Sequence, residues 1–211
     1  MALRTAASGD IAGALSYFTP AKFPNEKQED AVREAYIELR LRRLVELAAA
    51  RQCATAVQGL TNLDAEDKRL PFTSHGFASF TKGARFQYWL GVVEFACVDE
   101  NAARRRWQIL AKASPDLASI DHAYPYMALA KLDPAEAAVQ ARKALGFLER
   151  QLGSALPEFQ GRLLHSQGVL QMVAGRKDDA AASFRAGAEA GPAGMVEYLN
   201  LDAIRMLDAG Q

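Results

Sequence analysis

The stretch that decides the fold is residues 84–115, ARFQYWLGVVEFACVDENAARRRWQILAKASP. It predicts two helices joined by a short turn. Gly91 is followed by Ala103, Trp107 and Pro115 at fixed offsets, and the same offsets recur near the other end of the chain in Gly168, Ala180, Phe184 and Pro192. A ladder of small, small, aromatic and proline residues that occurs twice at identical spacing predicts a repeated helical hairpin.

Helix packing explains these residue types. Small residues at Gly91 and Ala103 let the two helices of a hairpin approach closely, and Trp107 is large enough to fill the space between successive hairpins. Pro115 ends the second helix, because proline cannot continue the ladder of hydrogen bonds. One such hairpin cannot bury its apolar face alone, so the units are expected to stack.

The pattern resembles the tetratricopeptide repeat family. The residues that carry the resemblance are Leu90, Gly91, Ala103, Trp107 and Pro115 in one unit, and Gly168, Gly175, Ala180, Phe184 and Pro192 in the other. Gly187 stands where this family usually has alanine. The resemblance implies an all-α fold, a right-handed superhelical array of helix-turn-helix hairpins whose first helices line a concave, protein-binding surface.

The rest of the chain is expected to extend one array over residues 1–211. The predicted units are 28–63, 84–117, 121–152 and 158–193, with a C-terminal capping helix at 195–208. Residues 64–83 lack a sustained helical period and are predicted to form an insertion loop, a class of segment that often carries function.

Residues 1–24 are predicted to form a partial unit. Gly9, Ala14 and Phe18 repeat the spacing of Gly175, Ala180 and Phe184, so this segment is expected to supply the second helix of a hairpin. The sequence therefore predicts a piece of a longer protein, and it is similar in arrangement to the repeat tails of large bacterial multidomain proteins.

Composition and charge narrow the class of function. The 25 basic and 25 acidic residues leave no net charge, which argues against nucleic acid as the main partner. Neither a secretion signal nor a membrane-spanning apolar run appears, so a cytoplasmic location is the default expectation. Cys53 and Cys97 form no CxxC motif and are expected to be reduced, buried thiols, with a disulfide or redox pair as the alternative.

The sequence contains no recognisable catalytic pattern. His75, His122 and His165 are not spaced as metal ligands, and His122 and His165 are expected on helix surfaces. Phosphate-binding and nucleophile-elbow motifs are absent from the sequence. We therefore expect a chain that is not an enzyme and that needs no cofactor or metal.

The predicted binding site is the concave surface formed by the first helices of two units. Taking Gly91 and Gly168 as equivalent, helical geometry is expected to turn eight residues inward: Arg85, Tyr88, Val92, Phe95, Arg162, His165, Val169 and Met172. Two arginines among aromatic and apolar side chains suit a peptide that is acidic and hydrophobic. Arg104, Arg105 and Arg106 are expected on the outer, solvated surface instead.

The family that this chain resembles has a well-known mode of peptide binding, in which Lys and Asn on the concave face bind a C-terminal carboxylate. Tyr88, Val92, His165 and Val169 occupy those places here, which disfavours that mode. The sequence thus predicts a non-catalytic protein-interaction scaffold. The alternative is a regulatory or structural repeat tail of a larger multidomain enzyme.

Overall fold

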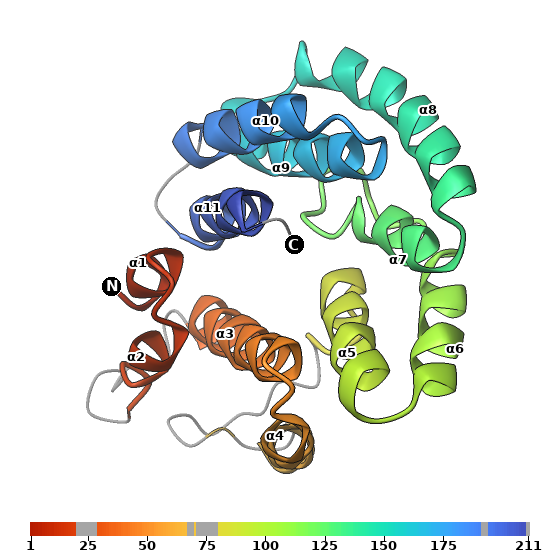
Figure 1. Cartoon of the computed structure of the whole chain (residues 1–211). Coiled ribbons are helices and arrows are strands. Elements are labelled where there is room, and N and C mark those ends of the chain that lie inside the picture. The colour runs from red at the N-terminus through yellow and green to blue at the C-terminus, as the bar shows by residue number, and fades with distance from the viewer. Residues whose placement is uncertain (20–28, 67–69, 71–79, 191–193, 210–211) are drawn as a thin grey trace. The chain divides into compact units, whose positions relative to one another are not determined.

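The computed structural model describes residues 1–19, 29–66, 70, 80–190 and 194–209 (Figure 1). Helix accounts for 77% of the structure, and the described residues contain no strand, so the all-α prediction is confirmed. The chain divides into two compact units, Met1–Arg106 and Trp107–Gln211. The superhelical arrangement of repeated hairpins stays a prediction.

The first unit is built around one long helix. Its elements are α1 (Ala2–Ala7), α2 (Ile11–Leu15), α3 (Glu29–Ala49), α4 (Cys53–Glu66) and α5 (Ala84–Cys97). Helices α2, α4 and α5 all pack against α3, as Figure 1 shows. Leu39, Leu41 and Leu44 of α3 are buried, and the Leu44 side chain lies against Gly59 of α4. The helices expected within 28–63 and 84–117 are therefore present.

The turn between α1 and α2 matches the turn between two later helices. Gly9 has φ 97° and Gly175 has φ 81°, a left-handed conformation that favours glycine. Ala14 and Ala180, five residues after each glycine, are both fully buried. The repeated spacing in the sequence therefore corresponds to a repeated local geometry, and Asp10 caps α2 by accepting a hydrogen bond from the Gly13 N–H at 2.7 Å.

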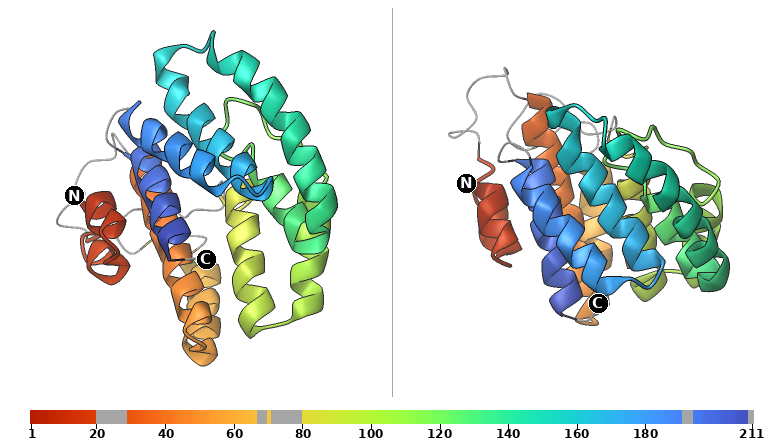
Figure 2. Two further views of the ribbon diagram at one scale, coloured as in Figure 1. Left: turned by 45° about the horizontal axis from the view of Figure 1, so that its top comes forward. Right: turned by 90° about the horizontal axis from the view of Figure 1, so that it is seen from above.

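Helix α6 (Glu100–Leu110) crosses the boundary between the units, and the second unit continues with α7 (Tyr124–Leu132), α8 (Pro134–Leu152), α9 (Pro157–Val173), α10 (Lys177–Glu189) and α11 (Met195–Asp208). Helix α9 is the centre of this unit, because α7, α8, α10 and α11 all contact it (Figure 2). Capping chemistry fixes the start of α8: the Asp133 carboxylate accepts from the Glu136 N–H at 3.0 Å, with Pro134 in the first turn.

Two glycines show why small residues occur at the crossings of α10. A Cβ added to Gly168 of α9 would lie 2.5 Å from the ring of the fully buried Phe184 of α10. A Cβ added to Gly187 would lie 2.8 Å from the side-chain amide of Asn200, which is buried on α11. Gly187 thus makes room for a buried amide, and a helix is present over the predicted residues 195–208 as α11.

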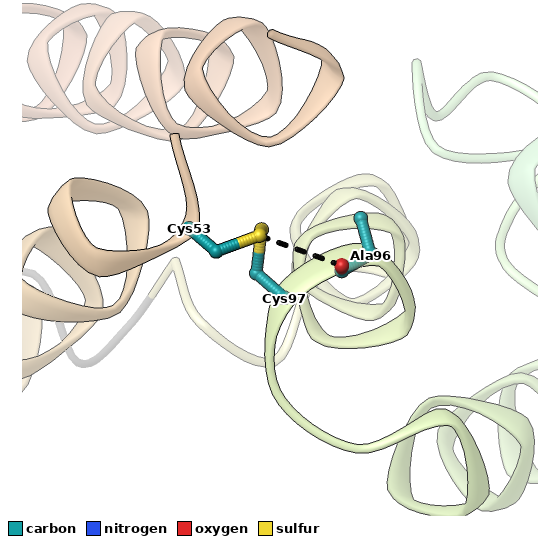
Figure 3. The surroundings of a disulfide bond; sticks show 3 residues. All are labelled: Cys53, Ala96 and Cys97. Carbon is teal, nitrogen blue, oxygen red and sulfur yellow. Dashed lines mark hydrogen bonds between the residues drawn. A yellow bond between two sulfur atoms is a disulfide. The ribbon is translucent and has the colours of Figure 1, made fainter. Parts of the chain in front are cut away.

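The structure corrects the expectation for the two cysteines. Cys53 and Cys97 are joined by a disulfide, with Cα atoms 4.9 Å apart (Figure 3). Both side chains are half-buried rather than buried. The expectation of reduced core thiols is wrong, because the fold brings together two cysteines that are 44 residues apart in the sequence, and the alternative of a disulfide is the one found. The disulfide therefore joins the first residue of α4 to the last residue of α5.

The predictions for the 64–83 insertion and for His75 concern residues that the structure describes only in part. The insertion expected at 64–83 lies mostly outside the described residues, although α4 extends through Glu66 and Leu70 is buried. His75 also lies outside them. Among the described helices, none is both long and apolar enough to cross a bilayer.

Candidate partner-binding surface

Arg85 was predicted to lie on an open concave surface, but in the structure its side chain is buried. Its guanidinium lies 2.7 Å from an oxygen of Glu34 and 3.1 Å from an oxygen of Glu38 on α3. The second Glu38 oxygen accepts from Arg42 Nε at 2.9 Å, and the side chains of Arg85, Glu38 and Arg42 are all buried. Because these charges already neutralise one another, Arg85 cannot also serve an acidic peptide, and the prediction that it lies in an open groove is wrong.

The neighbouring residues of α5 divide between core and surface. Tyr88 is buried, with its ring edge-on to Trp89 at 4.9 Å, and the Arg42 guanidinium lies 3.9 Å from the Trp89 ring. Val92 is half-buried, and Phe95 is exposed. The face of α5 predicted to bind a partner is therefore mostly the face that packs on α3.

The predicted residues of α9 are also mostly internal. His165 and Val169 are each 2% exposed, and Met172 packs against the hydrophobic core of the second unit. His165 lies between the rings of Tyr124 at 6.3 Å and Phe184 at 5.6 Å, so its predicted place on a helix surface is wrong.

Arg162 is the exception on α9, because its side chain is exposed. The reason for the errors is the central position of α9, which four helices surround, whereas the sequence-based register assumed one free face. A signal was available: residues 163–175 contain no Asp, Glu, Lys or Arg. A helix with no charged face is usually buried on several sides.

The outer side of α8 carries an exposed surface that the sequence analysis missed. Val139, Lys143, Phe147 and Arg150 are spaced by four, four and three residues, so they share one face of the helix. We call these four residues the α8 stripe. All four are exposed, and Phe147 is 49% exposed although it is a large aromatic residue.

The basic groups of the α8 stripe differ from those of the first unit. The Arg150 guanidinium lies 5.8 Å from the centre of the Phe147 ring. In the part of the chain that the structure describes, no carboxylate forms an ion pair with Lys143 or Arg150. Exposed Arg142 adds a further positive charge beside the stripe. This face therefore combines apolar surface with basic side chains that form no ion pair with the described carboxylates.

A similar pair at the end of α5 provides a contrast. Phe95 is 44% exposed, and the Arg104 guanidinium lies 5.9 Å from its ring. Arg104, however, forms an ion pair with Glu100 at 2.8 Å. The positive charge beside Phe95 is thus already balanced by α6 itself.

The three consecutive arginines of α6 do not form one outward surface. Arg104 and Arg105 are exposed as predicted, but Arg106 folds back onto α5, where its guanidinium lies 2.6 Å from Glu94 and also bonds to Gln87. Arg105 lies 3.8 Å from Asp99. Acidic partners beside all three arginines make a phosphate-binding track a poor interpretation.

The described residues contain no group of three His, Cys, Asp or Glu side chains that could hold a metal ion. His122 is half-buried, and its Nδ1 lies 3.2 Å from the carbonyl oxygen of Pro115. This contact joins two residues of the segment between α6 and α7. Comparisons of the chain with models of protein families, with curated proteins and with solved structures found no match.

Proposed function

We propose that this chain is a non-catalytic scaffold that binds a protein partner through the α8 stripe. One observation carries the proposal: Phe147 is exposed between basic side chains that have no ion-pair partner among the described residues. Burying an aromatic side chain contributes strongly to protein interfaces. Unbalanced positive charge beside it favours a partner that brings carboxylates.

The proposed partner segment is acidic and hydrophobic, the chemistry expected from the sequence but at a different place. Val139 and Phe147 are eight residues apart, which corresponds to about 12 Å along a helix at 1.5 Å per residue. Lys143 lies between them. An amphipathic helix with two apolar contacts about two turns apart and acidic residues between them matches this pattern.

The test uses a defined probe, a fluorescein-labelled helical peptide with leucines on one face and glutamates beside them. Binding is measured by fluorescence anisotropy. Phe147→Ala is expected to weaken binding by about 1–2 kcal/mol, and Lys143→Glu with Arg150→Glu by a similar amount. Binding should also weaken as salt increases, because exposed charges are screened.

The matched control is Phe95→Ala. Phe95 has a similar exposed fraction and a similarly placed arginine, but that arginine is balanced by Glu100. We expect this variant to bind the peptide like the unmodified chain. Equal losses at Phe95 and Phe147, or equal affinity for a lysine–leucine peptide, would refute the α8 stripe as a specific site.

A further inference from the structure

Helix α4 has a small buried face. Its buried residues are Ala56, Gly59 and Leu63, whereas most of its other side chains are exposed or half-buried. Gly59 approaches α3 so closely that an added Cβ would lie 2.3 Å from a methyl carbon of Leu44. Two of the three buried residues contribute little apolar area, so packing alone holds α4 weakly.

Attachments at the two ends of α4 compensate for this small interface. At its C-terminal end, both carboxylate oxygens of Glu66 lie 3.2 Å from the hydroxyl of Tyr36, and one lies 3.5 Å from Arg40. At its N-terminal end, the disulfide from Cys53, the first residue of the helix, reaches Cys97, the last residue of α5 (Figure 3). One end is therefore held by hydrogen bonds and the other by a covalent bond.

The disulfide is accessible. Cys53 and Cys97 are half-buried, and Ala96 and Val98 beside Cys97 are exposed. Cys53 Sγ lies 3.6 Å from the carbonyl oxygen of Ala96, so a reduced Cys53 thiol has an acceptor in place. The two residues that carry the bond are therefore partly exposed to the solvent from which a thiol reagent approaches.

We propose that Cys53–Cys97 is a reversible redox site that controls whether α4 is fixed to α5. In the reducing direction, a thiolate of a dithiol attacks one of the two sulfurs and forms a mixed disulfide. The second thiol of the reagent then displaces the protein, which leaves two protonated cysteines and the oxidised, cyclic reagent. Two electrons and two protons pass to the protein, and oxidation reverses both.

Release of α4 has a defined structural consequence. Leu44 is 2% exposed and lies directly against Gly59, so movement of α4 uncovers this leucine on α3. The bond closes a loop of 44 residues of sequence, and its loss removes that restriction on the unfolded chain. The state of α4 therefore follows the redox state of its surroundings.

The experiment compares hydrogen exchange in the complete chain before and after dithiothreitol, with alkylation and mass measurement to count free thiols. After both thiols are free, amides of residues 53–66 are expected to exchange at least about tenfold faster, while those of α3 and α9 change little. Oxidised glutathione should restore the slow exchange.

The control variant is Cys53→Ser with Cys97→Ser, which should exchange like the reduced chain and show no response to dithiothreitol. Three results would overturn the proposal: unchanged exchange in α4 although both thiols are free, equally faster exchange throughout the first unit, or thiols that become free only in denaturant. The last two would identify a structural cross-link that stabilises the whole unit. If the control variant does not fold, the reductant series on the unmodified chain still decides between these outcomes.

Discussion

Gly168→Ala tests whether α9 and α10 cross where the structure places them. The new Cβ would lie 2.5, 2.6 and 2.8 Å from three carbons of the Phe184 ring, closer than van der Waals contact allows. Phe184 is fully buried, and the His165 ring lies 5.6 Å from it, so the ring has little freedom to move away. We therefore expect the substitution to strain the core of the second unit.

Two opposing terms set the magnitude. Replacing glycine by alanine inside a helix stabilises it by about 0.8–1.0 kcal/mol. Adding a carbon to a filled core costs about 1–3 kcal/mol. Gly146 on α8 measures the first term alone, because a Cβ added there has nothing within 4 Å and both glycines lie within helices of the same unit.

Gly146→Ala should therefore raise the free energy of unfolding by about 1 kcal/mol. The free energy of unfolding of the Gly168→Ala variant should be about 1–3 kcal/mol lower than that of the Gly146→Ala variant. Urea unfolding followed by circular dichroism measures both, with equal slopes required for a valid comparison. If Gly168→Ala stabilises the chain as much as Gly146→Ala, Phe184 does not lie on Gly168 and the assigned crossing is wrong.

Glu38→Gln should lower the free energy of unfolding by about 3–5 kcal/mol, because it leaves Arg85 and its neighbouring arginine buried without their shared carboxylate. The exposed Glu100→Gln serves as control and should change it by less than about 1 kcal/mol in the same urea assay; equal effects would contradict the cluster. Burial, with the Glu66 carboxylate second, raises the pKa of Tyr36 to about 12. The unfolded chain, with the ordinary value near 10, loses this proton first, so the contribution of Tyr36 is complete below pH 10 and decreases as the pH rises toward 12. Unfolding measured at pH 9 and pH 11 should show a smaller decrease for Tyr36→Phe than for the unmodified chain, and an identical decrease would contradict the assignment.

Local features of the fold could be predicted because they depend on neighbouring residues. Asp133 and Pro134 predict the start of α8 through capping chemistry alone, and the structure shows that cap. The shared spacing of Gly168 and Phe184 anticipated a close crossing of two helices, and they do make contact. Phe184 was expected between successive hairpins, whereas it lies against Gly168 of the preceding helix, and the arrangement of the hairpins as an array remains untested.

Which side of a helix faces solvent could not be predicted in the same way. The helical register taken from Gly91 and Gly168 placed Arg85 and His165 on an open concave face, but ion pairs and aromatic rings from other helices contact them. Phe147 is apolar and would normally be assigned to the core. On α8 the buried side is fixed by Ala141, Leu145 and Leu148, and Phe147 lies two residues after Leu145, on the other side of the helix.

The proposed binding residues could be named only after the pairing of charges was known. Arg104 and Arg150 are indistinguishable in a sequence as basic residues near an aromatic ring. The structure separates them, because one has a carboxylate 2.8 Å away and the other has none among the described residues. Cys53 and Cys97 likewise become a pair only when two helix ends are brought together.

The junction of α7 and α8 leaves no room for a change in chain length. Asp133 is both the residue that ends α7, where its N–H donates to the Leu129 carbonyl at 2.7 Å, and the residue that caps α8. One residue inserted after Asp133 would turn everything beyond it by about 100°, the rotation per residue of an α-helix. The rotation would carry Phe147 away from solvent and bring charged residues toward α9. Homologous chains that keep the exposed α8 stripe should therefore tolerate substitutions at the junction far better than insertions or deletions.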